Sequence, residues 1–474
     1  EGGVEGGASG EGSACLDATL WLSPAREQVA PPSAAEVFAA AAAHWPREWS
    51  RGAALDLSGS AAKGAAALEA RVVRSQYLSM SQEAGSSPPQ ETGLVLNSWY
   101  GKFHTEMRWM HSAHHFLWGR PDLALRCEPY FERVRAQARR HTRVAQRYRG
   151  VRWPKMAGPP QLMPAIGDAV EPAGAPLFDG PSGAGPLIVW EQVHPIVFAE
   201  LAYRSAPDAA TVERHNRTVH DSADFMADFV LAPLPPSEPH ACLPLGPPLW
   251  TAEVESNEGR PASDATSQNP TFELVYWRFG LTLAARWRRR LGLPPVLAWQ
   301  EVLARLCKPT ARPLRGVPGS SPGYRPYERS SDAALISNGV APQLFAAAFA
   351  PGETFGADAA ALRNTLGATI AALLHNLPWG SDAAMYAMAA ARLGNASLAA
   401  SILADPDGVW TRRFAPSGHY ANAFLPVYLP ANGALLAAVA FMAGGWDGDG
   451  GRPAPGFPRD GSWTVRAEGF SKYF

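Results

Sequence analysis

The sequence predicts an all-α protein whose helices form a closed double ring, with six helices inside and six outside. Apolar residues recur at helical spacing in about a dozen segments, and almost no stretch alternates apolar and polar residues as a half-buried strand does. Pro- and Gly-rich loops separate these segments at 157–186, 232–249, 308–327 and 445–459, and they are longer than ordinary connections. Ala-rich helices joined in pairs by long loops suit two closely packed rings. The alternative is an α-solenoid, which would show a sequence repeat of fixed length. The sequence contains no such repeat.

The helices are predicted from their apolar periodicity, and the first of them also carries a start signal. The first is introduced by Ser33, followed three residues later by Glu36, which is the spacing of a capping box. The predicted helices cover residues 34–44, 61–81, 102–118, 130–147, 195–205, 209–230, 270–291, 297–306, 341–350, 357–376, 381–393, 397–404 and 432–443.

Three regions are expected along the chain. Residues 1–32 are expected to form a flexible leader that is Gly- and Glu-rich over residues 1–13, and the apolar stretch Cys15–Leu22 could be a strand at the end of a preceding β-domain. Residues 33–446 form the helical domain, and residues 447–474 form an extension that packs on it.

The overall composition excludes several classes of protein. The formal net charge of −1 lacks the basic footprint of a nucleic-acid-binding protein, so no nucleic acid is expected as a partner. No apolar run reaches the roughly 18 residues that a membrane span needs.

The four cysteines lack the spacing of metal ligands, and one or two disulfides can form among them, with pairing left open. The sequons at Asn216 and Asn395 predict a glycoprotein, secreted or lumenal.

The segment 97–120 is the densest in aromatic, basic and acidic side chains. Lys102, His104 and Glu106 together offer donors and acceptors for several sugar hydroxyls. Either Trp99 or Trp109 could stack on the face of a sugar ring.

Two histidines in the same segment superficially suggest a metal site. His111 and His115 are four residues apart on one helix face, but no third ligand has a suitable spacing. We therefore expect packed or hydrogen-bonded histidines, no metal and no cofactor.

The segment 97–120 resembles the Trp-Asp-Thr-Glu region of glycoside hydrolase family 65 and its relatives, the six-hairpin glycosidases. Further matches follow in the same order from about residue 40 to 445, and the ordered set is more specific than any single motif. They are Val151–Met156, Gln192–His194 with Ala199–Tyr203, Asn269–Trp277 and Trp379–Gly394. The resemblance implies an (α/α)6 barrel, the six-hairpin toroid, with residues 15–30 as a remnant of the family's N-terminal β-sandwich.

The resemblance also implies a site that binds carbohydrate. Besides Trp99, Lys102, His104 and Glu106, the positions that match the sugar-binding loops are Trp153, Lys155, Glu191, His194 and Trp379. Glu191 is expected to bind a hydroxyl group, because the matching position in the family transfers no proton.

In the resembling family, the general acid is a Glu in the loop before the helix that matches Asn269–Trp277. Here that loop contains Glu253 and Glu255, and the family's Gly-Pro-Asp-Glu signature is not reproduced. Both residues are candidates, with Glu253 preferred, and the alternative is that both are surface charges. A catalytic acid in this loop needs its pKa raised by burial, to which Trp250 could contribute.

The second predicted carboxylate is Asp382. In family 65 phosphorylases the matching loop cradles phosphate, which a carboxylate would repel, so Asp382 favours hydrolysis with itself as the base. The alternative is that Asp382 only caps a helix starting at Ala383. With Glu253 or Glu255 as acid, the mechanism would be inverting, which requires carboxyl groups about 6.5–9.5 Å apart.

The resemblance therefore predicts an inverting glycoside hydrolase acting on an oligosaccharide or glycoside. The alternative is a catalytically inactive six-hairpin barrel that binds carbohydrate or has a structural role, because the catalytic signature is altered.

Overall fold

The described part of the chain is mostly helical, so the all-α prediction is confirmed. The computed structural model describes residues 18–20, 30–158, 185–232, 241–246, 249–252, 267–314, 321–330, 335–336, 339–375, 377 and 379–474. The chain divides into two compact units, Glu1–Gly52 and Ala53–Phe474, whereas the sequence analysis placed the start of the helical domain at residue 33. No described helix has the length and apolar character needed to cross a membrane.

The described helix of the first unit is α1 (Ala34–Trp49). Its predicted capping box is present: the Ser33 hydroxyl accepts from the Glu36 N–H at 3.3 Å, and the Glu36 carboxylate accepts from the Ser33 N–H at 2.8 Å. The helix runs five residues beyond the predicted end at His44, because Pro46 is accommodated inside it. The apolar stretch Cys15–Leu22 lies mostly outside the described residues.

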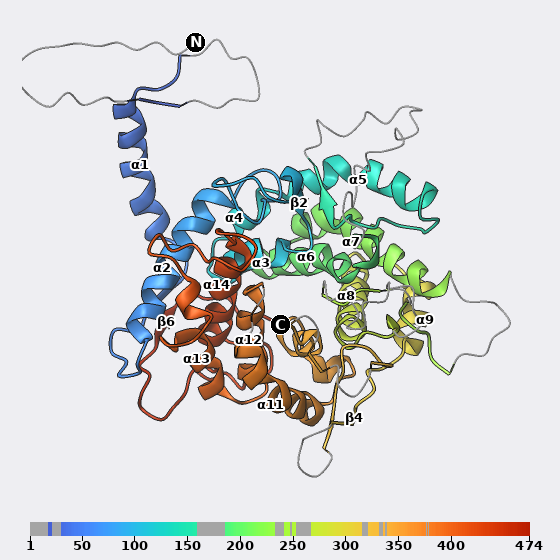
Figure 1. The fold of residues 1–474 in the computed structure, drawn as a ribbon. Coiled ribbons are helices and arrows are strands. Elements are labelled where there is room, and N and C mark those ends of the chain that lie inside the picture. The colour runs from blue at the N-terminus through green and yellow to red at the C-terminus, as the bar shows by residue number, and fades with distance from the viewer. Residues whose placement is uncertain are drawn as a thin grey trace, which may run out of the picture. The chain divides into compact units, whose positions relative to one another are not determined.

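The helices of the second unit form an inner and an outer layer. The inner helices are buried over most of their surface: α3 (Arg108–Leu117), α6 (His194–Ser205), α8 (Thr271–Arg290), α10 (Phe345–Ala348), α12 (Ser381–Arg392) and α14 (Leu429–Gly444). The outer helices bury one face only: α2 (Ala65–Gln82), α5 (Glu128–Val144), α7 (Ala209–Leu231), α9 (Leu297–Arg305), α11 (Ala359–His375) and α13 (Ala396–Ala404). Figure 1 shows α2, α9, α11 and α13 outside α3, α8, α12 and α14. A short α4 (Pro121–Leu125) follows α3 and was not predicted.

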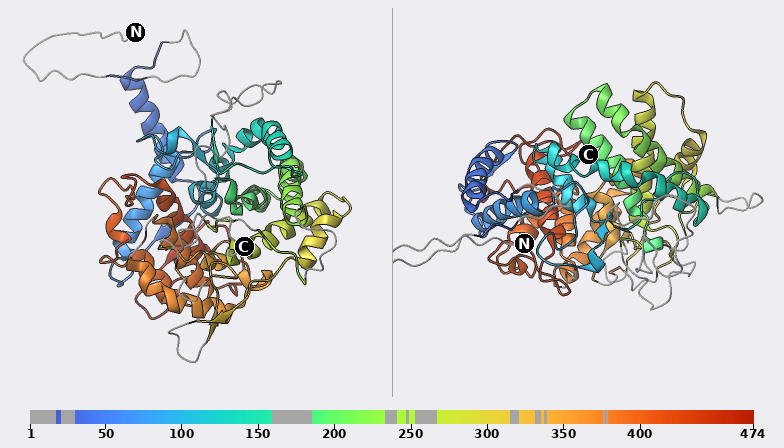
Figure 2. Two further views of the ribbon diagram at one scale, coloured as in Figure 1. Left: turned by 45° about the vertical axis from the view of Figure 1, so that its right-hand side comes forward. Right: turned by 90° about the horizontal axis from the view of Figure 1, so that it is seen from above.

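Each inner helix contacts the next along the chain. Contacts join α3 to α6, α6 to α8, α8 to α10, α10 to α12 and α12 to α14, and α14 packs back onto α3. Several outer helices pack on inner ones, as α7 does on α6 and α8, α13 on α12, and α2 on α14. The beginning and end of the second unit lie side by side, as Figures 1 and 2 show for α2 and α14.

Three short antiparallel ladders connect loops that lie far apart in sequence. The pairs are β1 (Ala54–Asp56) with β6 (Arg466–Glu468), β2 (Phe103–His104) with β3 (Met156–Ala157), and β4 (Arg312–Pro313) with β5 (Pro322–Gly323). The β2–β3 ladder explains why α3 begins at Arg108 and not at Lys102 as predicted. In its register His104 lies opposite Met156, so Lys155 is brought beside the start of α3.

The last residues of the chain pack among the inner helices. The Tyr473 hydroxyl donates to the Phe349 carbonyl at 3.0 Å and accepts from the Trp109 indole N–H at 3.1 Å. Trp109 is completely buried there. Of the two tryptophans predicted to stack on a sugar ring, Trp109 is therefore a core residue and cannot do so.

Candidate active site

All six inner helices begin with a buried polar side chain. The residues are Glu106 just before α3, Glu191 just before α6, Glu273 in the first turn of α8, Gln343 just before α10, Asp382 in the first turn of α12 and Asn432 in the first turn of α14. The N-terminal end of a helix carries partial positive charge and unpaired N–H groups, which favour a carboxylate there. These side chains can belong to one site only if the starts of the six helices lie close together.

Contacts between neighbouring helices bring these starts together. His194 at the start of α6 donates to the Glu106 carbonyl at 3.0 Å. The rings of Trp190 and Phe272, before α6 and in α8, lie 5.9 Å apart, and Phe272 lies 5.7 Å from Phe345 at the start of α10.

The same series of contacts continues back to α3. Phe345 lies 6.0 Å from Tyr386, one turn beyond Asp382 in α12. The ring of Trp379, before α12, lies 6.5 Å from that of Tyr428, before α14, and the Tyr428 hydroxyl contacts Met107 Sδ before α3 at 3.6 Å. The six starts therefore share one end of the inner layer.

A buried network of four charged side chains lies at the start of α3. The carboxylate of Glu106 contacts Nδ1 of His104 at 3.1 Å and Nζ of Lys155 at 2.6 Å. Glu91 approaches the same His104 nitrogen to 3.5 Å. Of the predicted site residues, the structure therefore brings His104, Glu106 and Lys155 together. Glu91 is a member that the sequence analysis missed, because its loop gives no motif.

The network balances its own charges. Burial lowers the pKa of His104, but the carboxylates of Glu106 and Glu91 raise it further, to about 9, so the imidazole is protonated at neutral pH. Two cations then face two carboxylates. Glu91, His104 and Glu106 could each offer one ligand atom to a metal ion, since these atoms lie within 4.8 Å of one another. Lys155 competes for Glu106 with any such ion, and the side chains present neutralise the network without one.

Two tryptophans lie beside this network. The indole N–H of Trp99 donates to Glu91, and the Trp99 ring lies 6.0 Å from His104 and 6.5 Å from Trp379. Trp99 is 37% exposed and Trp379 is half-buried, so both can contact a ligand. Lys102 is half-buried on the segment between Trp99 and His104.

Asp382 is the predicted base, and it lies in the first turn of α12. The helix starts at Ser381 and its N-cap is Gly380, so the alternative that Asp382 caps a helix starting at Ala383 is wrong. The carboxyl group is buried, and its Oδ2 atom has no hydrogen-bond partner among the described residues. Burial raises the pKa of Asp382 to about 7, against a smaller lowering by a hydrogen bond to the Gly380 backbone.

The predicted acids Glu253 and Glu255 lie outside the described residues. The segment that leads to them, 249–252, is held by Glu273: the Thr251 hydroxyl donates to one carboxylate oxygen at 2.6 Å and the Ala252 N–H to the other at 3.0 Å. Burial raises the pKa of Glu273 to about 7, and these hydrogen bonds oppose the shift. The sequence analysis missed Glu273, although an acidic residue inside the apolar run of the predicted helix was a usable signal.

Three other predicted residues are occupied by contacts within the protein. His194 donates to Glu106 and accepts from the Tyr276 hydroxyl at 2.9 Å, and burial lowers its pKa to about 3, so it stays neutral. Trp153 is buried, and its indole N–H donates to Ser222 of α7 at 2.8 Å. Glu191 is buried and accepts from the Gln192 side chain at 2.7 Å.

The two histidines of α3 that suggested a metal site pack against α2. His111 contacts Glu83, and His115 contacts the Ser79 hydroxyl at 3.5 Å. This agrees with the prediction that they are packed side chains.

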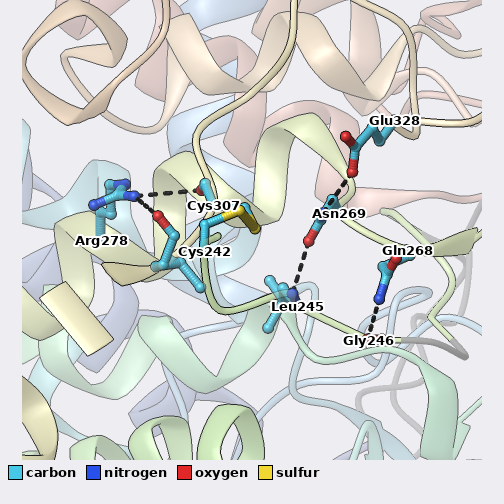
Figure 3. Close-up of a disulfide and its surroundings, with 9 residues drawn as sticks. Cys242, Leu245, Gly246, Gln268, Asn269, Arg278, Cys307 and Glu328 are labelled. Carbon is cyan, nitrogen blue, oxygen red and sulfur yellow. Dashed lines mark hydrogen bonds between the residues drawn. A yellow bond between two sulfur atoms is a disulfide. The ribbon is translucent and has the colours of Figure 1, made fainter. Parts of the chain in front are cut away.

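A disulfide joins the beginning of the segment that leads to Glu253 to the residues that follow α9. Cys242 and Cys307 are joined across a separation of 65 residues, while Cys127 is free and buried. Figure 3 shows Asn269 near this disulfide. The Asn269 side chain accepts a hydrogen bond from the Leu245 N–H at 2.8 Å and donates one to the Glu328 carboxylate at 2.6 Å. The entry to this loop is thus tied covalently to the end of α9 and by hydrogen bonds to the start of α8.

No protein-family model and no curated protein sequence matches the chain.

Proposed function

We propose that residues 53–474 form an (α/α)6 barrel and that its carboxylates hydrolyse a glycosidic bond with inversion. The proposed barrel is supported by the inner helices, whose contacts run from α3 to α14 and return to α3. It places the six polar helix starts at one mouth of the barrel.

The observation that carries the proposed activity is the carboxyl group of Asp382. A buried carboxyl group with a pKa near 7, one of whose oxygens accepts no hydrogen bond from the described residues, is suited to accept a proton from water at neutral pH. The same end of the inner layer offers the other groups that a sugar site needs: indole rings at the exposed Trp99 and the half-buried Trp379, and charged hydrogen-bonding groups at Lys102 and in the Glu91–His104–Glu106–Lys155 network.

In the proposed reaction, Asp382 removes a proton from water while the water oxygen attacks the anomeric carbon. The bond to the leaving oxygen breaks, and this oxygen receives a proton from Glu253 or Glu255. Glu273 is a positioning residue, because both of its oxygens hold the segment that leads to the acid.

The test is hydrolysis of a panel of aryl α- and β-glycosides and natural disaccharides. Asp382→Asn should lower kcat/KM by about 10²–10⁴-fold for any sugar that is turned over, as loss of a general base does. In the wild type, kcat/KM should rise with pH through about 7, because Asp382 must be deprotonated. Glu253→Gln and Glu255→Gln identify the acid, since only one should match the loss caused by Asp382→Asn. Unchanged turnover in Asp382→Asn would refute the mechanism.

The alternative function is a barrel that binds sugar without hydrolysing it. The exposed aromatic rings favour this reading independently of the carboxylates. Sugar binding that survives Asp382→Asn but is lost in Trp99→Ala, with no turnover of any substrate, would assign the protein to this class.

A secreted or lumenal location is part of the proposal. The disulfide fits an oxidising compartment. Of the two sequons, Asn395 is exposed at the N-cap of α13, whereas Thr218 of the other is buried within α7. Glycosylation is therefore expected at Asn395.

A further inference from the structure

A row of three aromatic rings runs from the buried network toward solvent. Trp99 begins it beside His104, Trp379 follows at 6.5 Å, and Phe424 lies 5.1 Å beyond Trp379. His104 is 3% exposed, Trp99 37% and Phe424 61%, while Trp379 between the two outer rings is half-buried. The rings come from three separate segments, so the row is a product of the tertiary fold.

Local structure holds both ends of the row in place. The backbone of Trp99 has a positive φ of 46°, a conformation that costs free energy in a bulky residue, and the indole N–H is fixed by Glu91. At the other end, the Asn422 side chain accepts from the N–H groups of Phe424 and Leu425 at 2.8 and 2.7 Å and donates to the Trp379 carbonyl at 3.4 Å. These bonds hold Phe424 with 61% of its surface exposed, so most of its ring gains nothing from burial in the protein.

We propose that Trp99, Trp379 and Phe424 bind successive units of an oligosaccharide that extends out of the site. This inference rests on the proposed function and adds to it a chain-length requirement. A series of three aromatic rings, spaced by 6.5 and 5.1 Å, matches the repeated apolar faces of linked sugar rings better than it matches a single ring. The planes are inclined by 49° between Trp99 and Trp379 and by 32° between Trp379 and Phe424, so the row fits a chain whose units turn relative to one another.

The experiment measures binding separately from hydrolysis. The full chain carrying Asp382→Asn is titrated with malto-, cello- and manno-oligosaccharides of one to four units, and tryptophan fluorescence is recorded. For the matching series, affinity should increase by about two- to tenfold with each unit that stacks on a ring. In Phe424→Ala the increment from the outermost unit should disappear while shorter ligands bind as before, and Phe424→Tyr should retain it. Leu297→Ala is the control, because Leu297 is 79% exposed on α9 and far from the row in sequence.

The outcomes separate this inference from the proposed function. Equal affinity for one and four units, no binding in any series, or an unchanged length dependence in Phe424→Ala overturns the inference, even if Asp382→Asn abolishes hydrolysis. Length-dependent binding that is lost in Phe424→Ala supports the inference, even if the wild type hydrolyses none of the substrates.

Discussion

Two buried carboxyl groups at helix starts, those of Glu273 and Asp382, differ in their hydrogen-bond partners. Glu273 accepts a hydrogen bond at each oxygen, from Thr251 and Ala252, and so holds a loop in place. Asp382 is also buried, and one of its oxygens has no partner in the part of the chain that the structure describes. An unpaired buried polar atom destabilises a fold, so it persists most readily where a ligand or a reaction requires it.

Asp382 should therefore lower stability at high pH. Its pKa is 3.8 in the unfolded reference and about 7 in the folded protein, so its favourable contribution is complete below pH 3.8 and is lost as pH rises through 7. Asp382→Asn should raise the free energy of unfolding at pH 8 by up to about 4 kcal/mol and change it little at pH 4. Urea denaturation at the two pH values measures this.

Asp208→Asn is the control for this experiment. Asp208 is the exposed N-cap of α7, and its hydrogen bonds with Thr211 lower its pKa, so the substitution should give no gain at pH 8. Equal effects of Asp382→Asn at both pH values would show that the carboxyl group is not buried as described.

Sequence reasoning identified site residues where the signal is local. Lys102, His104 and Glu106 lie within five residues of each other, and their composition alone suggested a polar site. Glu91 joins them only because its loop folds back onto His104. No spacing in the sequence could reveal that contact.

At the scale of elements, the helical periodicity was a good guide. The predicted helix at 209–230 is α7 almost unchanged, since its apolar face and the Asp208 cap are both encoded locally. The predicted helix at 341–350 is reduced to α10, preceded by a tight turn at Pro342–Leu344. The Tyr386 hydroxyl of α12 accepts the Ala341 N–H, a tertiary contact that periodicity cannot show.

The turn before α12 should depend on a single glycine. Gly380 has a φ of +98°, and a Cβ atom there would lie 2.2 Å from the Tyr420 ring. Gly380→Ala should therefore cost about 1–2 kcal/mol for the backbone conformation and a further 1–3 kcal/mol or so for displacing Tyr420. It should also displace Trp379 and Asp382 and thereby lower any hydrolytic activity. Urea denaturation and the glycoside panel measure the two effects.

Gly394→Ala separates the two contributions. Gly394 follows the same helix with a φ of +89°, but nothing lies within 4 Å of its hypothetical Cβ. It should show the backbone cost alone and leave activity unchanged. Equal losses in the two variants would mean that Tyr420 does not pack on Gly380.

For the molecule as a whole, the decisive contact joins the first and last inner helices. α3 and α14 lie more than 300 residues apart in the sequence and pack together more extensively than any other pair of helices. Each helix could be predicted from its own residues, but the sequence carries no local signal for this pairing. The proposed closed ring depends on it.

This contact should be sensitive to one added methyl group. A Cβ atom at Gly433 of α14 would lie 2.0 Å from the Met110 carbonyl oxygen of α3, so the two backbones touch directly. Gly433→Ala should lower the free energy of unfolding by about 1–3 kcal/mol, because the helices must move apart.

The matched control is Gly367→Ala in α11, where nothing lies within 4 Å of the added atom. That substitution should instead raise the free energy of unfolding by about 0.5–1 kcal/mol, since alanine is the better helix former. Urea denaturation of the full chain, followed by circular dichroism and tryptophan fluorescence, compares the two variants. If Gly433→Ala stabilised the protein as Gly367→Ala should, α3 and α14 could not be in direct contact, and the proposed ring would be open between its first and last helices.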